Sequence, residues 1–104
     1  MAMRPTDRRP THPGGMLLEE WLKPMGLSQT DFAAALGVPF QRLNELILGK
    51  RGVTPDTALR LSRVLGTTPE LWLNLQQAWD LWHAMQTPDA KAIAKLKPLK
   101  VPAG

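Results

Sequence analysis

The sequence predicts an all-α domain of five short helices, with a short sixth helix left open. Apolar residues recur at three- and four-residue spacings between residues 14 and 86, and no segment alternates with the period of two that marks a half-buried strand. A length of 104 residues favours a single domain. Three segments repeat a helix-start signal in which a capping threonine precedes a proline and an acidic residue: Thr54-Pro55-Asp56, Thr68-Pro69-Glu70 and Thr87-Pro88-Asp89.

The first two helices are expected before residue 38. An apolar stripe indicates a first helix over Gly15–Lys23, and Pro24 is expected to end it because the residue before a proline avoids helical geometry. Ser28 is a typical N-cap, and Asp31 follows three residues later in a variant of the capping box. The second helix begins there and is expected to end at Gly37, a typical glycine after a helix C-terminus.

The third helix follows a turn of about two residues, Gly37-Val38. It is expected to begin near Pro39, a favoured first-turn residue, and to end at Gly49. A short, glycine-containing link between two helices is typical of the helix-turn-helix motif. The fourth and fifth helices start at the threonine signals, and we expect them to end at Gly66 and near Met85. The last threonine signal indicates the short sixth helix.

Composition excludes several classes of protein. The absence of cysteine excludes a disulfide scaffold, a cysteine-ligated zinc site and a thiol nucleophile. No apolar run is long enough to span a bilayer, so we expect no membrane partner and a cytoplasmic location. The chain is too small for a barrel enzyme or a two-domain nucleotide enzyme. A pI near 10.0 indicates an anionic partner, for which nucleic acid is the obvious candidate.

The basic charge lies at the two ends of the chain. Residues 1–11 carry a net charge of +2 and residues 87–104 a net charge of +3, whereas residues 12–86 carry six basic and seven acidic groups. We expect a flexible N-terminal arm over residues 1–13, a folded DNA-binding and dimerisation domain over residues 14–86, and a basic C-terminal tail over residues 87–104. The tails are compatible with phosphate contacts and also with ordinary solvated termini.

The predicted third helix has an apolar face and a polar face. Leu43, Leu46 and Ile47 recur at helical spacing, and about 100° of rotation per residue then turns the polar residues outward. In the major groove glutamine and asparagine pair with adenine, arginine with guanine and glutamate with cytosine. The N-terminal residues of the second helix of a helix-turn-helix approach that groove. The candidates for this contact are Pro39, Phe40, Gln41, Arg42, Asn44 and Glu45.

Four further residues are candidates for phosphate contacts, which set affinity and register rather than sequence preference. Gln29 starts the second helix, where backbone N–H groups are free, Lys50 and Arg51 follow the third helix, and Thr54 caps the fourth. Plainer alternatives remain open. The polar face is also compatible with ordinary solvated surface, and Phe40 with the edge of the core.

The predicted fifth helix holds three of the four tryptophans. Its apolar residues cover a wide arc, and others lie roughly opposite, so one small core cannot cover both faces. Exposed aromatic surface usually marks an interface, and we therefore expect a C2 homodimer. The alternative is a long helix that simply closes the core. The candidate interface residues are Trp72, Leu75, Trp79 and Trp82.

The sequence indicates no catalytic or metal site, and we expect no cofactor. Asp80 and His83 could share a helix face, but a metal or an acid–base site needs more groups in the same place. His12 lies at the entry to the first helix. No Walker loop or nucleophile motif is present. The lack of tyrosine and of clustered basic groups also argues against a small ribonuclease.

Several strings resemble the lambda-repressor-like, XRE-type helix-turn-helix group: Leu27-Ser28-Gln29, Leu36-Gly37-Val38, Asn44-Glu45, Gly49-Lys50-Arg51 and Thr54. Further strings narrow the resemblance to the HigA antitoxins: His12-Pro13-Gly14, Asp56 to Leu61, and Pro69 with Trp72 to Gln76. The resemblance covers about residues 12 to 82. It departs from the family at Gly15, where an acid is usual, and at Val38-Pro39 and Phe40, where small hydroxyl and polar residues are usual.

The resemblance implies an antitoxin of a type II toxin–antitoxin system. Such a protein binds operator DNA as a dimer, represses its own operon and neutralises a HigB-type toxin, an mRNA endonuclease that acts on the ribosome. The alternative is a stand-alone XRE-type transcriptional regulator without a toxin. The departures bear on the operator sequence more than on the function.

Overall fold

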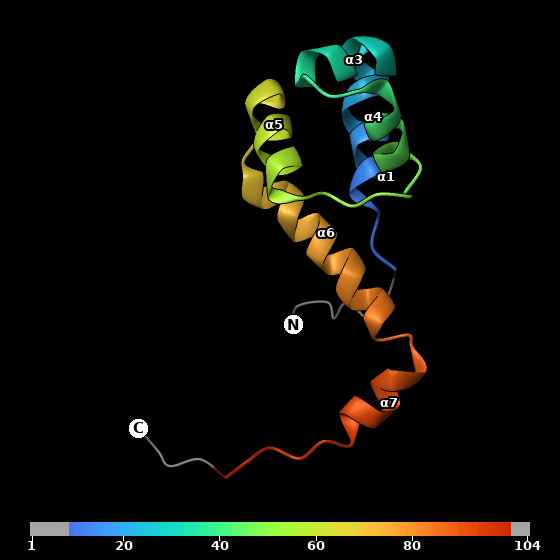
Figure 1. Cartoon of the computed structure of the whole chain (residues 1–104), viewed down its shortest axis with the longest axis vertical. Helices are drawn as coiled ribbons and strands as arrows, with labels where there is room; N and C mark the ends of the chain where they lie inside the picture. The colour runs from blue at the N-terminus through green and yellow to red at the C-terminus, as the bar shows by residue number, and fades with distance from the viewer. Residues whose placement is uncertain (1–8, 101–104) are drawn as a thin grey trace.

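All regular secondary structure in the residues that the structure describes is helical. The computed structural model describes residues 9–100, in the order of elements shown in Figure 1. No strand occurs in that range, and the predicted all-α class is confirmed. The elements are α1 (Pro13–Leu17), the π-helical turn η2 (Leu18–Leu22), α2 (Lys23–Met25), α3 (Gln29–Leu36), α4 (Phe40–Ile47), α5 (Pro55–Leu65), α6 (Pro69–Ala84) and α7 (Pro88–Ala94).

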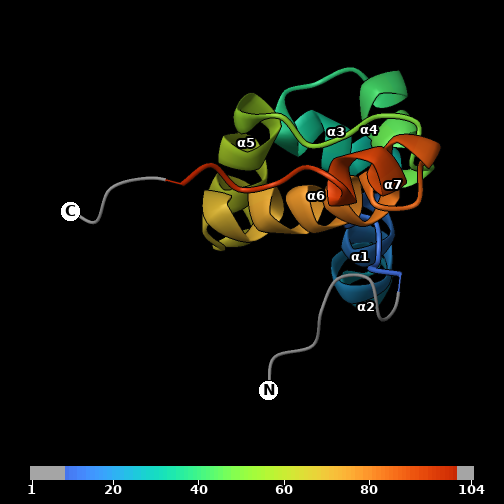
Figure 2. The same ribbon diagram turned by 90° about the horizontal axis from the view of Figure 1, so that it is seen from below.

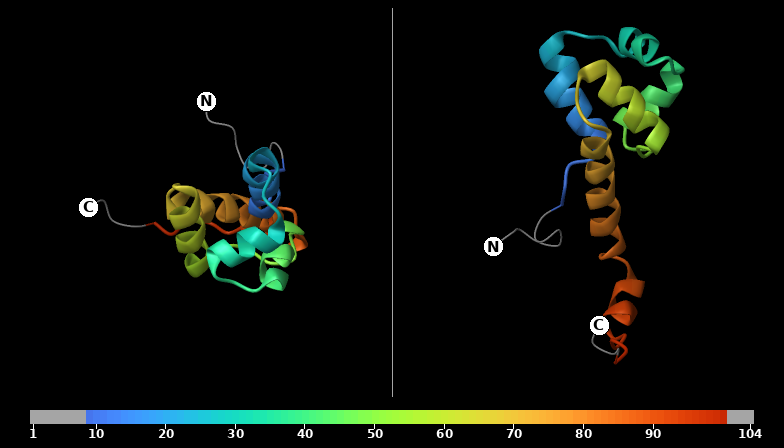
Figure 3. Two further views of the ribbon diagram at one scale, coloured as in Figure 1. Left: turned by 90° about the horizontal axis from the view of Figure 1, so that it is seen from above. Right: turned by 90° about the vertical axis from the view of Figure 1, so that its left-hand side faces the viewer.

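The helices up to α5 gather at one end of the molecule, and α6 leads away from them to α7 at the far end (Figure 1). In the view from below, α1 and α2 lie on one side of α6 and α3 to α5 lie on the other side (Figure 2). The view turned about the vertical axis shows the same gathering of α1 to α5 above the long α6 (Figure 3). The arrangement leaves the α3–α4 pair at the surface.

The first helix is longer than predicted and passes through Pro24. It runs without a break over residues 13–25 and ends at Gly26, whose φ is 65°. Within η2 the Lys23 N–H bonds five residues back, to the Leu18 carbonyl. This wider turn accommodates a proline, which has no N–H and whose ring clashes with a carbonyl of a regular α-helix. The prediction that Pro24 ends the helix is therefore wrong.

Three of the predicted caps are confirmed, whereas the prediction that the Thr87 side chain caps its helix is wrong, because its hydroxyl donates to the Ala84 carbonyl instead. In each of the three confirmed caps the side-chain oxygen accepts a hydrogen bond from the backbone N–H three residues later. The third helix begins at Phe40, one residue later than predicted, because Pro39 takes the extended N-cap position. The turn between α3 and α4 therefore has three residues and starts at Gly37, whose φ is 72°. The caps concerned are Ser28, Thr54 and Thr68.

Trp72 lies at the centre of the core. Its side chain has no exposed surface, its ring lies 5.1 Å from that of Trp21, and its Nε1 donates to Thr67 Oγ1 at 2.7 Å. The expectation that Trp72 contacts a second chain is therefore corrected, because the domain itself encloses the indole. Leu75 packs against the same core and is partly buried. The other large buried side chains come from the preceding helices and include Leu17, Leu22, Phe32, Leu43 and Leu61.

α1 crosses α4 at Gly14 with no room for a side chain. A Cβ added at Gly14 would lie 1.8 Å from the carbonyl oxygen of Leu46 and 2.8 Å from the Cα of Ile47. Both atoms belong to the α4 backbone, which moves only if the whole helix moves. The backbones of α1 and α4 are therefore in direct contact, and this contact fixes where α4 lies.

The residues just before α1 pack against α6. The ring of His12 lies edge-on to Trp79, with the ring centroids 4.9 Å apart, and the guanidinium of Arg9 lies 5.1 Å from the centroid of the Trp79 ring. Residues 9–12 of the predicted N-terminal arm thus contact the domain, whereas residues 1–8 lie outside the described residues.

His12 also caps α1, because its Nδ1 accepts a hydrogen bond from the Gly14 N–H at 3.0 Å. Burial lowers the pKa of His12 below its ordinary value of 6.5, Asp80 opposes this shift, and the neighbouring His83 adds to it. Because folding lowers this pKa, the folded chain favours the neutral imidazole. The stability that depends on the neutral imidazole is complete above pH 6.5 and is lost as the pH falls from there through the lower pKa of the folded chain.

The last threonine signal does start a sixth helix, α7. Residues 96–100 that follow it have no regular structure, and residues 101–104 of the predicted tail lie outside the described residues. The lysines of the described part of the tail are exposed. None of the helices within residues 9–100 is long and apolar enough to cross a membrane.

We expect Gly14→Ala to lower the free energy of unfolding by about 3 kcal/mol, because the new methyl group overlaps the α4 backbone. Gly15→Ala is the matched control, since a Cβ there meets only the Thr11 methyl at 3.7 Å. The control should keep the stability of the parent chain or raise it by about 0.5 kcal/mol. Urea unfolding followed by circular dichroism measures both values. Equal effects of the two substitutions would contradict the tight crossing.

Candidate nucleic-acid interface

The turn between α3 and α4 presents the start of α4 to solvent. The apolar face of α4 is buried as predicted, whereas Phe40 and Gln41 are exposed. Phe40 keeps 49% of its surface exposed, which favours a contact surface over the alternative of a core-edge residue. In a helix-turn-helix this end of the helix is the part that approaches the major groove.

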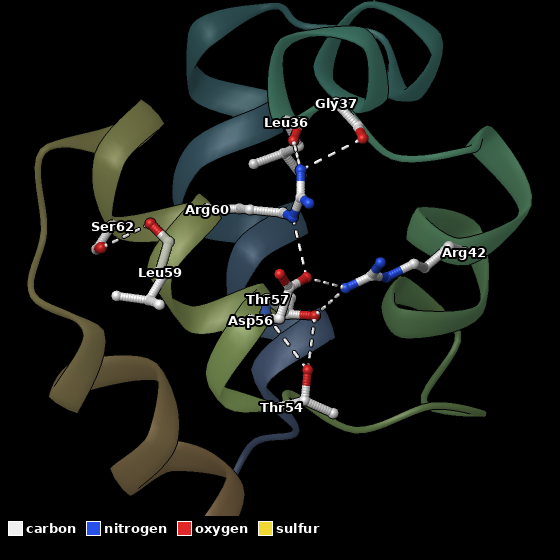
Figure 4. Close-up of polar contacts among 9 residues, drawn as sticks. All are labelled: Leu36, Gly37, Arg42, Thr54, Asp56, Thr57, Leu59, Arg60 and Ser62. Atoms are coloured by element: carbon white, nitrogen blue, oxygen red, sulfur yellow. Dashed lines mark hydrogen bonds and ion pairs between the residues drawn. The ribbon is translucent and has the colours of Figure 1, made fainter.

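Arg42 bonds to the start of α5 instead of pointing into solvent (Figure 4). Its Nη2 donates to Asp56 Oδ2 at 2.7 Å and to Thr57 Oγ1 at 2.8 Å. Arg60 donates from Nε to the same Asp56 oxygen at 2.9 Å. The Asp56 carboxylate therefore joins Arg42 of α4 to Arg60 of α5. Only 29% of the Arg42 side chain is exposed.

Arg60 extends this network to the end of α3. Its Nη1 donates to the carbonyl oxygens of Leu36 at 2.9 Å and Gly37 at 3.3 Å, as Figure 4 shows. The last carbonyls of a helix lack partners within the helix, and the partial negative charge there favours a cation. The guanidinium thus satisfies the carbonyls at the turn and ties α3 to α5.

The two arginines also act on the ionisation of Asp56. Hydrogen bonds from Arg42 and Arg60 hold the pKa of the Asp56 carboxyl below its ordinary value of 3.8, and desolvation opposes them. A pKa lowered by folding contributes stability that is present above pH 3.8 and is lost as the pH falls below it. The network is therefore intact at neutral pH.

Two other predicted base contacts have partners within the chain. The Asn44 Nδ2 donates to Gln29 Oε1 at 2.9 Å, which joins α4 to the first residue of α3. The Glu45 Oε1 accepts from Arg51 twice, at 3.1 Å from Nε and 2.8 Å from Nη2. The structure thus brings these residues together as two separate pairs, Asn44 with Gln29 and Glu45 with Arg51.

The remaining predicted residues lie around the same face. Lys50 and Thr54 are exposed on the loop between α4 and α5. A surface hollow of about 370 Å³ lies beside Gln41 and is also lined by Pro39, Arg42, Glu45 and Arg51. Five of the ten residues predicted to contact DNA therefore line one hollow, and the other five lie at the start of α3, on α4 and on the following loop.

Sequence reasoning missed the residues that hold this surface in place. In the sequence, Asp56 belongs to a helix-start signal and to a string of family resemblance, and Arg60 and Gln76 belong only to such strings. The Gln76 Oε1 accepts the Val53 N–H at 2.8 Å, and the Gln76 amide lies against Gly52, where an added Cβ would lie 2.9 Å from it. Gln76 therefore ties the loop after α4 to α6. Within residues 9–100 no group of three or more histidine and acidic side chains could hold a metal ion.

The fold and this exposed face define a helix-turn-helix protein. The family profile described as "Helix-turn-helix" matches residues 18–72, which is more than half of the chain. The chain therefore belongs to the helix-turn-helix family. This is a family of DNA-binding proteins rather than of enzymes.

Three known proteins illustrate the relationship. Virulence-associated protein I of Dichelobacter nodosus is 49% identical over 92 residues, which cover 88% of this chain and 83% of the relative. Antitoxin HigA-1 of Vibrio cholerae serotype O1 is 48% identical over 81 residues, which cover 77% of this chain and 75% of the relative. The solved structure of antitoxin GraA in complex with its operator has a TM-score of 0.81 and 46% identity, and the match covers 90% of this chain and 95% of that chain. The chain thus belongs to the HigA antitoxins within the helix-turn-helix family.

We expect Arg60→Met to lower the free energy of unfolding by about 1 kcal/mol, because it removes the hydrogen bonds to the α3 carbonyls and to Asp56. It should also speed hydrogen exchange at the Val38 N–H, which bonds to the Ala33 carbonyl across the turn. Arg63→Met is the control, since Arg63 is exposed on the same helix and lacks such bonds within residues 9–100. If the two variants exchange at the same rate, Arg60 does not hold the turn.

Proposed function

We propose that this chain is an antitoxin that binds operator DNA as a homodimer, represses its own operon and neutralises a HigB-type mRNA endonuclease toxin. It acts in the cytoplasm, where its operator lies. One observation carries the DNA-binding part: the exposed start of α4 stands beside the positive groups of the following loop, on helices locked together by Arg42, Asp56 and Arg60. The operator complex of the related GraA supports the same role.

The proposed interface separates base contacts from phosphate contacts. The start of α4 faces the bases, and Lys50 with the free backbone N–H groups at the start of α3 faces the phosphates. Phosphate contacts supply affinity without sequence preference and depend on salt. Residues 12–86 carry a net charge of −1, so this affinity depends on where the few basic groups lie.

The dimer that we propose forms through the C-terminal half of α6. Trp79 and Trp82 are partly buried there, and Leu81 and Met85 remain 47% and 38% exposed. Leu81 and Met85 also line an apolar groove of about 510 Å³ between α6 and α7, together with Ile93. A C2 dimer covers such a surface with its own copy and can place two recognition helices about 34 Å apart, on successive major grooves.

DNA binding is tested on the DNA upstream of the chain's own gene. We expect a footprint there, and Lys50→Ala should flatten the plot of log affinity against log salt by about one unit for each protomer. Gln41→Ala should weaken binding and leave the slope unchanged, because it removes a base contact. An absent footprint would refute the repressor role, and equal slopes for the two variants would remove Lys50 from the phosphate contacts.

Toxin neutralisation is tested by co-expression. An adjacent reading frame for a small basic protein should arrest growth when expressed alone, and this chain should restore growth and co-purify with its product. A chain that binds its operator but neither rescues growth nor forms that complex is a stand-alone transcriptional regulator, the alternative function.

The dimer surface is tested by charge. We expect Leu81→Glu to halve the mass measured by sedimentation at micromolar concentration, because it places a carboxylate in an apolar interface. Leu59→Glu is the control, since Leu59 is 60% exposed on α5, away from that surface. A Leu81→Glu chain that stays dimeric would place the interface elsewhere, and a monomeric parent chain would remove the homodimer from the proposal.

A further inference from the structure

The polar face of α4 offers fewer base contacts than its residue types suggest. The Arg42 Nη2 donates to Asp56 at 2.7 Å and to Thr57 at 2.8 Å. Either pair of parallel guanidinium donors includes Nη2, so a two-bond pairing with guanine would break these bonds. Thr57 is 8% exposed, so its hydroxyl would lose a partner that water cannot readily replace. Arg42 therefore acts as a positioning residue that sets the orientation of α4 against α5.

The side chains of Glu45 and Asn44 also form hydrogen bonds within the chain. Both bonds from Arg51 end on one oxygen of Glu45, and this pairing neutralises a carboxylate that phosphates would otherwise repel. The Asn44 amide donates to Gln29 and so joins the two helices of the motif. These contacts hold the face together in the absence of DNA.

At the start of α4, the side chains of Phe40 and Gln41 have no such partner within residues 9–100. Both are exposed, and neither side chain takes part in a hydrogen bond or an aromatic contact within residues 9–100. The contrast with Phe32 is clear, since that ring is 1% exposed in the core, whereas the Phe40 ring keeps half of its surface in water. If this ring covers an apolar group on the DNA, both bury apolar surface away from water, which favours binding.

The apolar group that the major groove offers is the C5-methyl of thymine, and the base that a glutamine pairs with in two hydrogen bonds is adenine. We infer that each half-site is read at neighbouring A·T pairs, where Phe40 packs on a thymine methyl and Gln41 bonds to an adenine, and that Arg42 reads no guanine. This inference rests on the proposed function, because it names the operator feature that the DNA-binding face selects.

The inference is tested by changing single atoms of the operator. Duplexes carry deoxyuridine in place of each thymine of a half-site in turn, which removes only the methyl group. We expect one position at which the parent chain loses about fourfold in affinity per half-site. Phe40→Ala should bind the thymine and uracil duplexes equally at that position. Leu48→Ala is the control, since it removes an exposed apolar side chain from the other end of α4 and should keep the full sensitivity.

A second set of duplexes carries 7-deazaadenine or 7-deazaguanine, which lack the N7 acceptor. We expect about fivefold weaker binding at one adenine, and this loss should vanish in Gln41→Ala. The inference is overturned if the parent chain is insensitive to uracil at every position, or if a guanine sensitivity disappears in Arg42→Met. These outcomes leave operator binding itself intact. A parent chain that binds no upstream DNA would instead refute the proposed function, and the inference with it.

Discussion

The contact between the backbones of α1 and α4 at Gly14 fixes the position of α4, and the rest of the interface depends on it. A Cβ at Gly14 would lie within 1.8 Å of the Leu46 carbonyl oxygen, so the two helices touch where any other residue would separate them. α1 is in turn capped by His12, whose ring packs on Trp79 of α6. The last turn of α4 is therefore held against α1 at backbone distance, whereas the start of the helix lies at the surface.

An ion pair between Arg42 and Asp56 holds the outer side of α4 against α5. Asp56 accepts from Arg42 and Arg60, and Arg60 also bonds to the carbonyls at the end of α3. Two of the basic groups nearest the DNA-binding face are thus used to fix helices. The acidic partner of these arginines also contributes to the low net charge of the domain, because it cancels charge that would attract phosphates.

Local signals were predictable from the sequence, and contacts between distant residues were not. Ser28 and Thr68 cap their helices as predicted, because a cap depends only on residues three positions away. Pro24 was misread, because a π-helical turn that accommodates proline leaves no mark that composition or periodicity detects. Trp72 was assigned to an interface, because a helical wheel gives the direction of a side chain but not whether Trp21 already covers it.

The same reasoning explains why the five candidate base contacts on α4 reduce to two, since Pro39 is the N-cap that precedes the helix. The helical wheel correctly turned the polar residues outward, but α3, α5 and the loop after α4 supply partners for three of them. One good base contact discriminates by about 1–3 kcal/mol, so two side chains per protomer discriminate weakly on a single half-site. Joining two half-sites doubles the number of base contacts and makes the second binding event intramolecular. In the proposed homodimer, a second copy of the chain therefore compensates for a small reading surface on a nearly neutral domain.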